Sequence, residues 1–73
     1  MTRWNYFFRS CEAISSNGRT VKMPTGHGMV TLADDASFEE VFFPGNQLEL
    51  KLLPGEIRRL EHAGLAERYG PVR

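Results

Sequence analysis

The chain has 73 residues, one cysteine, two histidines and a formal net charge of zero. This length fits a single small domain over residues 1–73, and 41% hydrophobic with 25% charged residues is typical of a globular protein. A lone Cys11 excludes a disulfide within the chain, and no run of about 18 apolar residues is present, so the composition favours neither a disulfide-rich secreted protein nor a membrane protein. We expect an intracellular protein that holds no metal and no cofactor.

The net charge of zero conceals an uneven distribution along the chain. Residues 1–33 and 57–73 carry an excess of arginine and lysine, whereas residues 34–56 carry an excess of aspartate and glutamate. The fold either presents oppositely charged surfaces, which would orient a partner during encounter, or brings the blocks together so that they neutralise one another. The sequence leaves both interpretations open.

The N-terminal segment is rich in aromatic side chains. Residues 4–14 predict one long strand, and the alternation of a strand places Trp4, Tyr6 and Phe8 on the same face. A strand of this composition is either part of the core or, at the edge of a sheet, a surface to which a partner adds a strand.

A hairpin is predicted directly after this strand. Asn17-Gly18 is a strong signal for a two-residue turn of type I′, because both central residues of that turn need a positive φ. Such a turn would pair Ile14 with Val21 and lead into a second strand over residues 19–23.

The middle of the chain is less regular. Residues 24–28 predict a flexible connection, residues 29–33 a third strand, and residues 34–37 a polar turn. Residues 37–43 fit a capping box with helical spacing but also alternate as a strand. We favour a short strand or a single turn here, because the Pro-Gly pair that follows ends either element.

The C-terminal third gives the clearest patterns. Residues 47–53 alternate leucine with charged residues and predict a half-buried strand. Pro54 suits the first turn of a helix, and Gly64 suits its end. Residues 66–73 are expected to be a flexible tail. The predicted fold is α+β, a small antiparallel sheet of three to four strands with one C-terminal helix.

The residues point to a binding surface rather than to catalysis. The glycine-rich residues 25–28 lack the lysine of a phosphate loop, His27 has no nucleophile or carboxylate near it in sequence, and Glu39 and Glu40 point apart in any regular element. We therefore expect no enzyme and no catalytic residue. Arginines interleaved with aromatics are typical of protein-binding hot spots. The candidate protein-binding residues are Arg3, Trp4, Asn5, Tyr6, Arg9, Arg58 and Arg59. For Trp4 and Tyr6 the alternative is that they lie in the core.

Residues 57–68 are similar to the end of a winged-helix module, in which a helix with Arg-Arg-Leu-Glu leads into Ala-Gly-Leu. A winged helix needs two further helices upstream, where this chain predicts strands. A small DNA-binding repressor that uses the C-terminal helix is therefore kept as an alternative function.

The length, the aromatic N-terminal strand, the Asn17-Gly18 hairpin and the neutral remainder together resemble the small transcription regulators of lytic Xanthomonas phages. The resemblance implies a protein of the host bacterial cytoplasm that binds host RNA polymerase near the N-terminal region of the β′ subunit and the RNA exit channel. It implies inhibition of promoter initiation by disturbing the σ factor. It also implies suppression of intrinsic termination with the host factor NusA, and contact with RNA. The remaining alternative is a phage protein that inhibits another host target.

Overall fold

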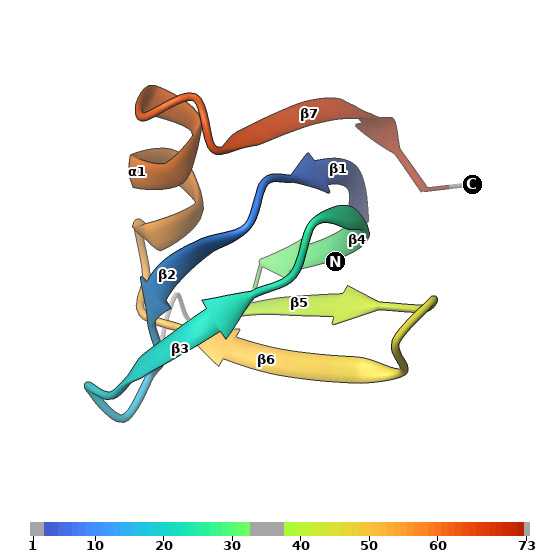
Figure 1. Cartoon of the computed structure of the whole chain (residues 1–73). Coiled ribbons are helices and arrows are strands. Elements are labelled where there is room, and N and C mark those ends of the chain that lie inside the picture. The colour runs from blue at the N-terminus through green and yellow to red at the C-terminus, as the bar shows by residue number, and fades with distance from the viewer. Residues whose placement is uncertain (1–2, 33–37, 73) are drawn as a thin grey trace.

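The structure is a computed structural model that describes residues 3–32 and 38–72. These residues form seven strands and one helix, all shown in Figure 1. The predicted α+β class is confirmed, but the predicted number of strands is too small, because five strands form one antiparallel sheet in the order β6-β5-β4-β1-β7 and two more form a separate hairpin. The elements are β1 (Arg3–Phe8), β2 (Cys11–Ile14), β3 (Thr20–Met23), β4 (Gly26–Leu32), β5 (Glu39–Phe43), β6 (Leu48–Leu52), α1 (Glu56–His62) and β7 (Ala66–Pro71).

The predicted N-terminal strand is divided in two. β1 ends at Phe8, and the chain turns at Arg9-Ser10 before β2 begins at Cys11. The backbone N–H of Ser10 donates to Oγ1 of Thr25 at 3.0 Å, across the turn that leads from β3 into β4. The turn lets β1 pair with β4 while β2 pairs with β3, so that both segments contribute to one core.

The hairpin forms at Asn17-Gly18, but its register is one residue away from the prediction. Ile14 pairs with Thr20 rather than with Val21. Gly18 has a φ of 87°, whereas Asn17 keeps a negative φ. The loop is therefore the three-residue kind, in which a type I turn is followed by a left-handed glycine.

Residues 24–28 are not the flexible connection that the sequence predicted, because β4 begins at Gly26 and pairs with β1 along its length. Gly28 allows this close pairing: a Cβ atom at this position would lie 3.0 Å from Cε2 of Phe8 and 3.3 Å from Cε2 of Phe43. The rings of Phe8 and Phe43 fill that space with their centroids 5.4 Å apart. Aromatic packing over a glycine thus joins the first and fifth strands across the fourth.

For residues 37–43 the sequence left a short strand or a single turn open, and the structure shows a strand, β5, over Glu39–Phe43. The strand predicted for residues 47–53 is confirmed by β6. Leu52 is buried and Leu48 and Leu50 are half-buried on the same face. Val41 and Phe43 of β5 lie beside them, since Val41 pairs with Leu50 and Phe43 with Leu48. The predicted turn at residues 34–37 lies outside the described residues.

The helix begins later than predicted, and its end is as predicted. Gly55, with a φ of 90°, is the N-cap, so Pro54 precedes the helix instead of lying in its first turn. At the other end Gly64 has a φ of 76°, the Leu65 N–H donates to the Leu60 carbonyl at 2.8 Å and the Gly64 N–H to the Glu61 carbonyl at 3.1 Å. These two bonds form a Schellman motif, which ends the helix and reverses the chain.

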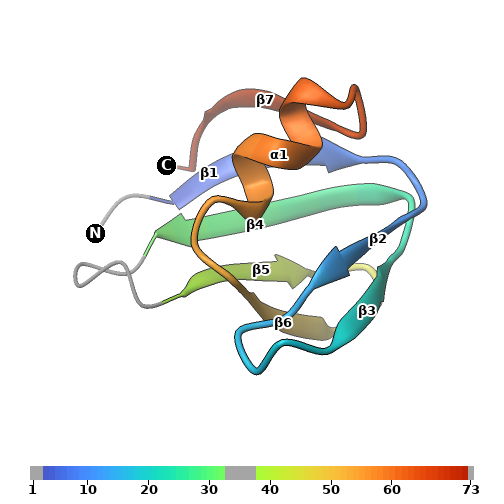
Figure 2. The same cartoon turned by 90° about the vertical axis from the view of Figure 1, so that its left-hand side faces the viewer.

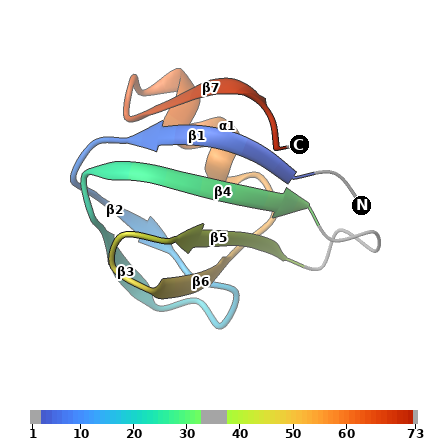
Figure 3. The same ribbon diagram turned by 90° about the vertical axis from the view of Figure 1, so that its right-hand side faces the viewer.

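The prediction of a flexible tail is wrong for residues 66–71, which form β7 and pair with β1. The Schellman turn directs the chain back toward the edge of β1, and the Arg9 N–H donates to the Leu65 carbonyl at 2.9 Å where the pairing starts. A register shift opposite Asn5 and Tyr6 places a bulge in β7. The two ends of the described chain therefore lie side by side in the sheet (Figure 3).

The two faces of the sheet differ in what covers them. Figure 2 shows α1 and the β2–β3 hairpin in front of one face, which we call the covered face. The hairpin is joined to the edge of β6 by backbone bonds, from the Ser16 N–H to the Lys51 carbonyl and from the Leu53 N–H to the Ile14 carbonyl. The core between these layers consists of Tyr6, Phe8, Ala13, Met23, Val30, Val41, Phe43, Leu52, Ile57, Leu60 and Ala66.

The other face, here called the open face, is seen directly in Figure 3. Among residues 3–32 and 38–72, no helix or strand lies over it. The alternation of the strands fixes which side chains it carries, since every second residue of each strand points away from the core.

Candidate binding surface

Two of the aromatic residues in the N-terminal strand belong to the core. Tyr6 is 4% exposed and Phe8 is fully buried, and their rings stack with centroids 5.7 Å apart. The Tyr6 hydroxyl donates to Oε1 of Glu61 on α1 at 2.7 Å. Burial, reinforced by this bond, raises the pKa of Tyr6 far above its usual value. Tyr6 ties the helix to the sheet and offers no surface to a partner, so the core interpretation holds for it.

Trp4 lies at the margin of the covered face and is half-buried. The guanidinium of Arg68 on β7 is 4.9 Å from the centroid of its ring, a cation–π contact between neighbouring strands. Part of the Trp4 surface is therefore already occupied within the molecule.

Arg3 and Asn5 lie on the open face. Arg3 is exposed at the start of β1. Oδ1 of Asn5 is 2.8 Å from Nε2 of His27, its neighbour on β4, and this bond holds both side chains against the sheet. Arg9 is exposed just beyond the end of β1, beside an open hollow of about 210 Å³ that Phe7 and Leu65 also line.

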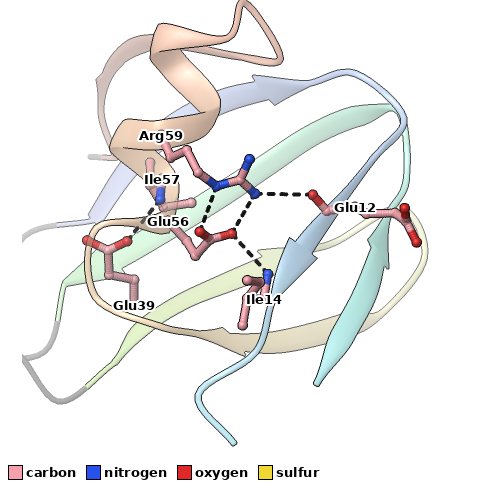
Figure 4. A network of polar contacts seen from close by, with 6 residues as sticks. All are labelled: Glu12, Ile14, Glu39, Glu56, Ile57 and Arg59. Carbon is pink, nitrogen blue, oxygen red and sulfur yellow. Dashed lines mark hydrogen bonds and ion pairs between the residues drawn. The ribbon is translucent and has the colours of Figure 1, made fainter. Parts of the chain in front are cut away.

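Arg59 belongs to a polar network that fastens the helix to the hairpin (Figure 4). Its Nε lies 2.7 Å from Oε1 of Glu56, and its Nη2 lies 2.8 Å from Oε2. The two contacts make a bidentate ion pair. The Glu56 carboxylate also accepts the Ile14 N–H at 2.9 Å, and Arg59 donates to the Glu12 carbonyl at 3.4 Å. Glu39 accepts the N–H of Ile57 beside it at 3.1 Å.

Glu56 is only 7% exposed, and a buried carboxylate is costly unless it is paired. The hydrogen bonds from Arg59 lower the pKa of Glu56, and the Ile14 N–H acts in the same direction, while burial opposes them. Burial raises the pKa of the neighbouring Cys11 thiol, which is therefore not activated as a nucleophile. This ion pair joins the acidic middle segment to the basic C-terminal segment, so these two blocks partly neutralise one another.

The candidate residues do not form one surface. Arg58 is exposed on α1, and Arg59 is held by Glu56 in the same layer. Arg3 and Asn5 point from the opposite side of the sheet. A partner that contacts the helix arginines therefore approaches a different side of the molecule from one that contacts Arg3 and Asn5.

The open face also carries residues that the sequence did not single out. Phe7, Met29 and Phe42 are half-buried there although they are apolar. Met29 pairs with Asn5 on one side and with Phe42 on the other, so these three side chains form a row across β1, β4 and β5. The alternation within residues 38–43 and 48–52 was the signal that could have identified this surface, once it was known which face is covered.

Beside this row is an open hollow of about 230 Å³. Glu40 and Glu49 contribute carboxylates to its lining, and Arg3 lies on the other side of Met29. The complete lining is Arg3, Met29, Thr31, Glu40, Phe42 and Glu49.

Within residues 3–32 and 38–72, no three His, Cys, Asp or Glu side chains are grouped so that they could hold a metal ion. No helix in the same residues has the length and apolar character needed to cross a bilayer.

Comparison of the chain with models of known protein families, with curated proteins and with solved structures finds no match in any of the three.

Proposed function

We propose that this chain is a phage-encoded transcription regulator that binds host bacterial RNA polymerase through the open face of its sheet. Two things support the proposal. One is the resemblance to the small regulators of lytic Xanthomonas phages. The other, which carries most weight, is the row of Asn5, Met29 and Phe42 on a sheet face that no described element covers. Apolar and aromatic side chains bordered by charges are what a docking surface requires.

The mechanism is docking without chemistry. A small rigid domain seated near the N-terminal region of β′ and the RNA exit channel stabilises the polymerase states in which it binds best, at the expense of those in which σ is properly engaged. The frequency of promoter initiation falls. Binding at the same site, together with NusA, suppresses intrinsic termination. The protein acts in the cytoplasm of the host bacterium.

Arginine contacts are secondary in this proposal. Arg3 borders the apolar row, and Arg9 lies beyond the end of β1, so both are placed to meet acidic polymerase surface or emerging RNA from the open side. Arg59 is committed to Glu56, which leaves Arg58 as the exposed arginine of the helix.

The test is direct binding to purified Xanthomonas RNA polymerase, with promoter-dependent transcription and read-through of an intrinsic terminator as activity readouts. Phe42→Ala removes apolar surface from the open face and is expected to weaken binding at least tenfold, as truncation of a central interface aromatic does. Ile14→Ala is the matched control, because Ile14 is 38% exposed on the opposite layer. Wild-type protein that does not bind the polymerase would end the proposal.

The DNA-binding alternative has little support in the fold. The described residues contain a single helix of seven residues, with Ile57 and Leu60 buried against the core, and a winged helix is built around three helices. A gel shift with duplex DNA and no polymerase separates the two functions, since only the repressor alternative predicts retardation. Arg58→Glu is the variant that would abolish such a shift.

A further inference from the structure

The hollow on the open face is of a size that suits one side chain. Its volume of about 230 Å³ is below the range of about 300–1,000 Å³ that small-molecule sites occupy. Met29 and Phe42 form an apolar floor, and both are half-buried, so their surfaces remain available to an aliphatic chain.

Two carboxylates border this floor. Glu40 pairs with Lys51 and Phe42 pairs with Glu49, which makes Glu40 and Glu49 diagonal neighbours on the same face. The backbones of such diagonal residues are about 7–8 Å apart. Their two carboxylates are therefore close enough for one cation with several N–H donors to contact both.

Two cations of the fold lie near these carboxylates. Arg3 lines the same hollow from β1, on the other side of Met29. Lys51 stands opposite Glu40, yet its ammonium lies over the ring of Phe38, 5.1 Å from the centroid. Within the described ranges 3–32 and 38–72, the ion pair that forms is that of Glu56 with Arg59, and neither Glu40 nor Glu49 has a cation within pairing distance. The hollow therefore combines an apolar floor with two carboxylates at one border and Arg3 at the other, so its lining carries a formal excess of one negative charge.

This combination selects the occupant by charge. A phosphate group in the hollow would meet the two carboxylates at close range and be repelled, which argues against nucleic acid as the occupant of the hollow. A lysine or arginine side chain fits, because it carries a cation at the end of an apolar stem. Arginine fits better than lysine, since its planar guanidinium stacks on an aromatic ring and donates to two carboxylates in fixed directions.

We propose that this hollow receives an arginine side chain of a partner protein, with its stem over Met29 and Phe42 and its guanidinium between Glu40 and Glu49. An acidic residue of the same partner lies next to Arg3. That the partner is the polymerase rests on the function proposed above, whereas the chemistry of the hollow rests on these residues alone.

The first experiment does not use the polymerase. The ¹⁵N-labelled full chain is titrated with the capped tripeptides Leu-Arg-Leu, Leu-Lys-Leu and Leu-Glu-Leu, and amide shifts are followed. The arginine peptide is expected to move the amides of Met29, Thr31 and Phe42, the lysine peptide to bind more weakly, and the glutamate peptide to leave them unmoved. Equal shifts with the glutamate peptide, or shifts confined to other residues, would overturn the proposal.

The charge requirement is tested with the double variant Glu40→Gln/Glu49→Gln. Its affinity for the arginine peptide is expected to fall at least about fivefold, as the loss of two partly exposed ion pairs implies. Glu12→Gln/Glu67→Gln makes the same charge change at two exposed positions outside the hollow, and it should stay within twofold of the wild type. Equal losses in the two double variants would show that only net charge matters and would refute the site.

A second readout covers the case in which the double variant folds poorly. Affinity of the wild-type chain for the arginine peptide should fall steeply between 20 mM and 500 mM salt, whereas binding by the apolar floor alone would persist. A salt-independent affinity would contradict the proposed role of the carboxylates.

The same variants with purified polymerase separate the two proposals. If the wild type binds polymerase and the Glu40→Gln/Glu49→Gln variant binds equally well, the hollow is not the contact although the proposed function stands. If the arginine peptide binds the hollow and polymerase does not bind the protein, the site stands and the proposed function fails.

Discussion

The two faces of this sheet are built from the same strands and serve different purposes. On the covered face Phe8, Val41 and Leu52 are fully buried. Their sequence neighbours on the open face are either charged or, like Phe7 and Phe42, apolar and only half-buried. The covered face determines stability. The open face keeps Phe7, Met29 and Phe42 only half-buried, and it is the surface on which we propose that a partner docks.

Size explains why one face stays open. A chain of this length buries only about 60–65% of the surface that it exposes when unfolded. One seven-residue helix and one short hairpin are sufficient to cover a single side of a five-stranded sheet. The second side must therefore remain in contact with solvent or with another molecule.

The largest predicted effect separates the two faces directly. Phe8→Ala should lower the free energy of unfolding by about 3–5 kcal/mol, because it empties the centre of the covered face. Phe42→Ala should cost only about 1 kcal/mol, a part of what full burial of such a ring contributes. Urea denaturation followed by circular dichroism measures both. Similar losses would mean that the open face is packed as tightly as the core.

A second prediction concerns the carboxylate of Glu56. Glu56→Gln should lower the free energy of unfolding by about 1.5–3 kcal/mol, because it removes the charge that Arg59 and the Ile14 N–H pair with. Glu49→Gln is the matched control on the open face and should change stability by less than about 0.5 kcal/mol.

The same carboxylate predicts a pH dependence. Its pKa is lowered in the folded state, so its contribution is complete above the ordinary value of 4.5 and is lost as the pH falls below it. Denaturation midpoints measured from pH 7 down to pH 3 should fall in the wild type, and that fall should be smaller in Glu56→Gln. Parallel curves for the two proteins would contradict the role of Glu56.

Another prediction tests the close packing over Gly28. Gly28→Ala should cost about 1–3 kcal/mol, because the added Cβ would lie 3.0 Å from the Phe8 ring and force the core to shift. Gly45→Ala is the control, since no atom lies within 4 Å of a Cβ built there. Thermal unfolding of the two variants distinguishes a packing requirement from the general cost of removing a glycine.

The smallest predicted effect is a difference in stability between variants of two adjacent arginines. Arg59→Ala should destabilise the fold by leaving buried Glu56 without its partner, but less than Glu56→Gln does, because the guanidinium is half-exposed and solvent reduces the loss. Arg58→Ala should be neutral within about 0.5 kcal/mol. Chemical denaturation of both variants provides the comparison, and an equal effect would show that the network of Figure 4 adds nothing to stability.

Part of the proposed binding surface could be predicted from the sequence. Arg3 and Asn5 were chosen from their aromatic neighbourhood, and both lie on the open face. Tyr6 came from the same run and is in the core, because side chains of a strand alternate and nothing local tells which side will be covered. Arg59 was selected as an exposed cation. Its pairing with Glu56 is an i,i+3 contact within α1, and the tertiary structure adds the burial of Glu56 and the Ile14 N–H that its carboxylate accepts.

The sequence by itself determined the α+β class, the strand β6 through its alternation, and the end of the helix at Gly64, because these depend on neighbours a few residues apart. It left β5 open between a strand and a single turn. The tertiary structure decided that the first strand divides at Arg9-Ser10 and that residues 66–71 join the sheet. Pairing between the two ends of a chain depends on which strand edge is free once the rest has folded, and that information is not local. The same long-range pairing decided which face of the sheet is covered by α1 and the β2–β3 hairpin.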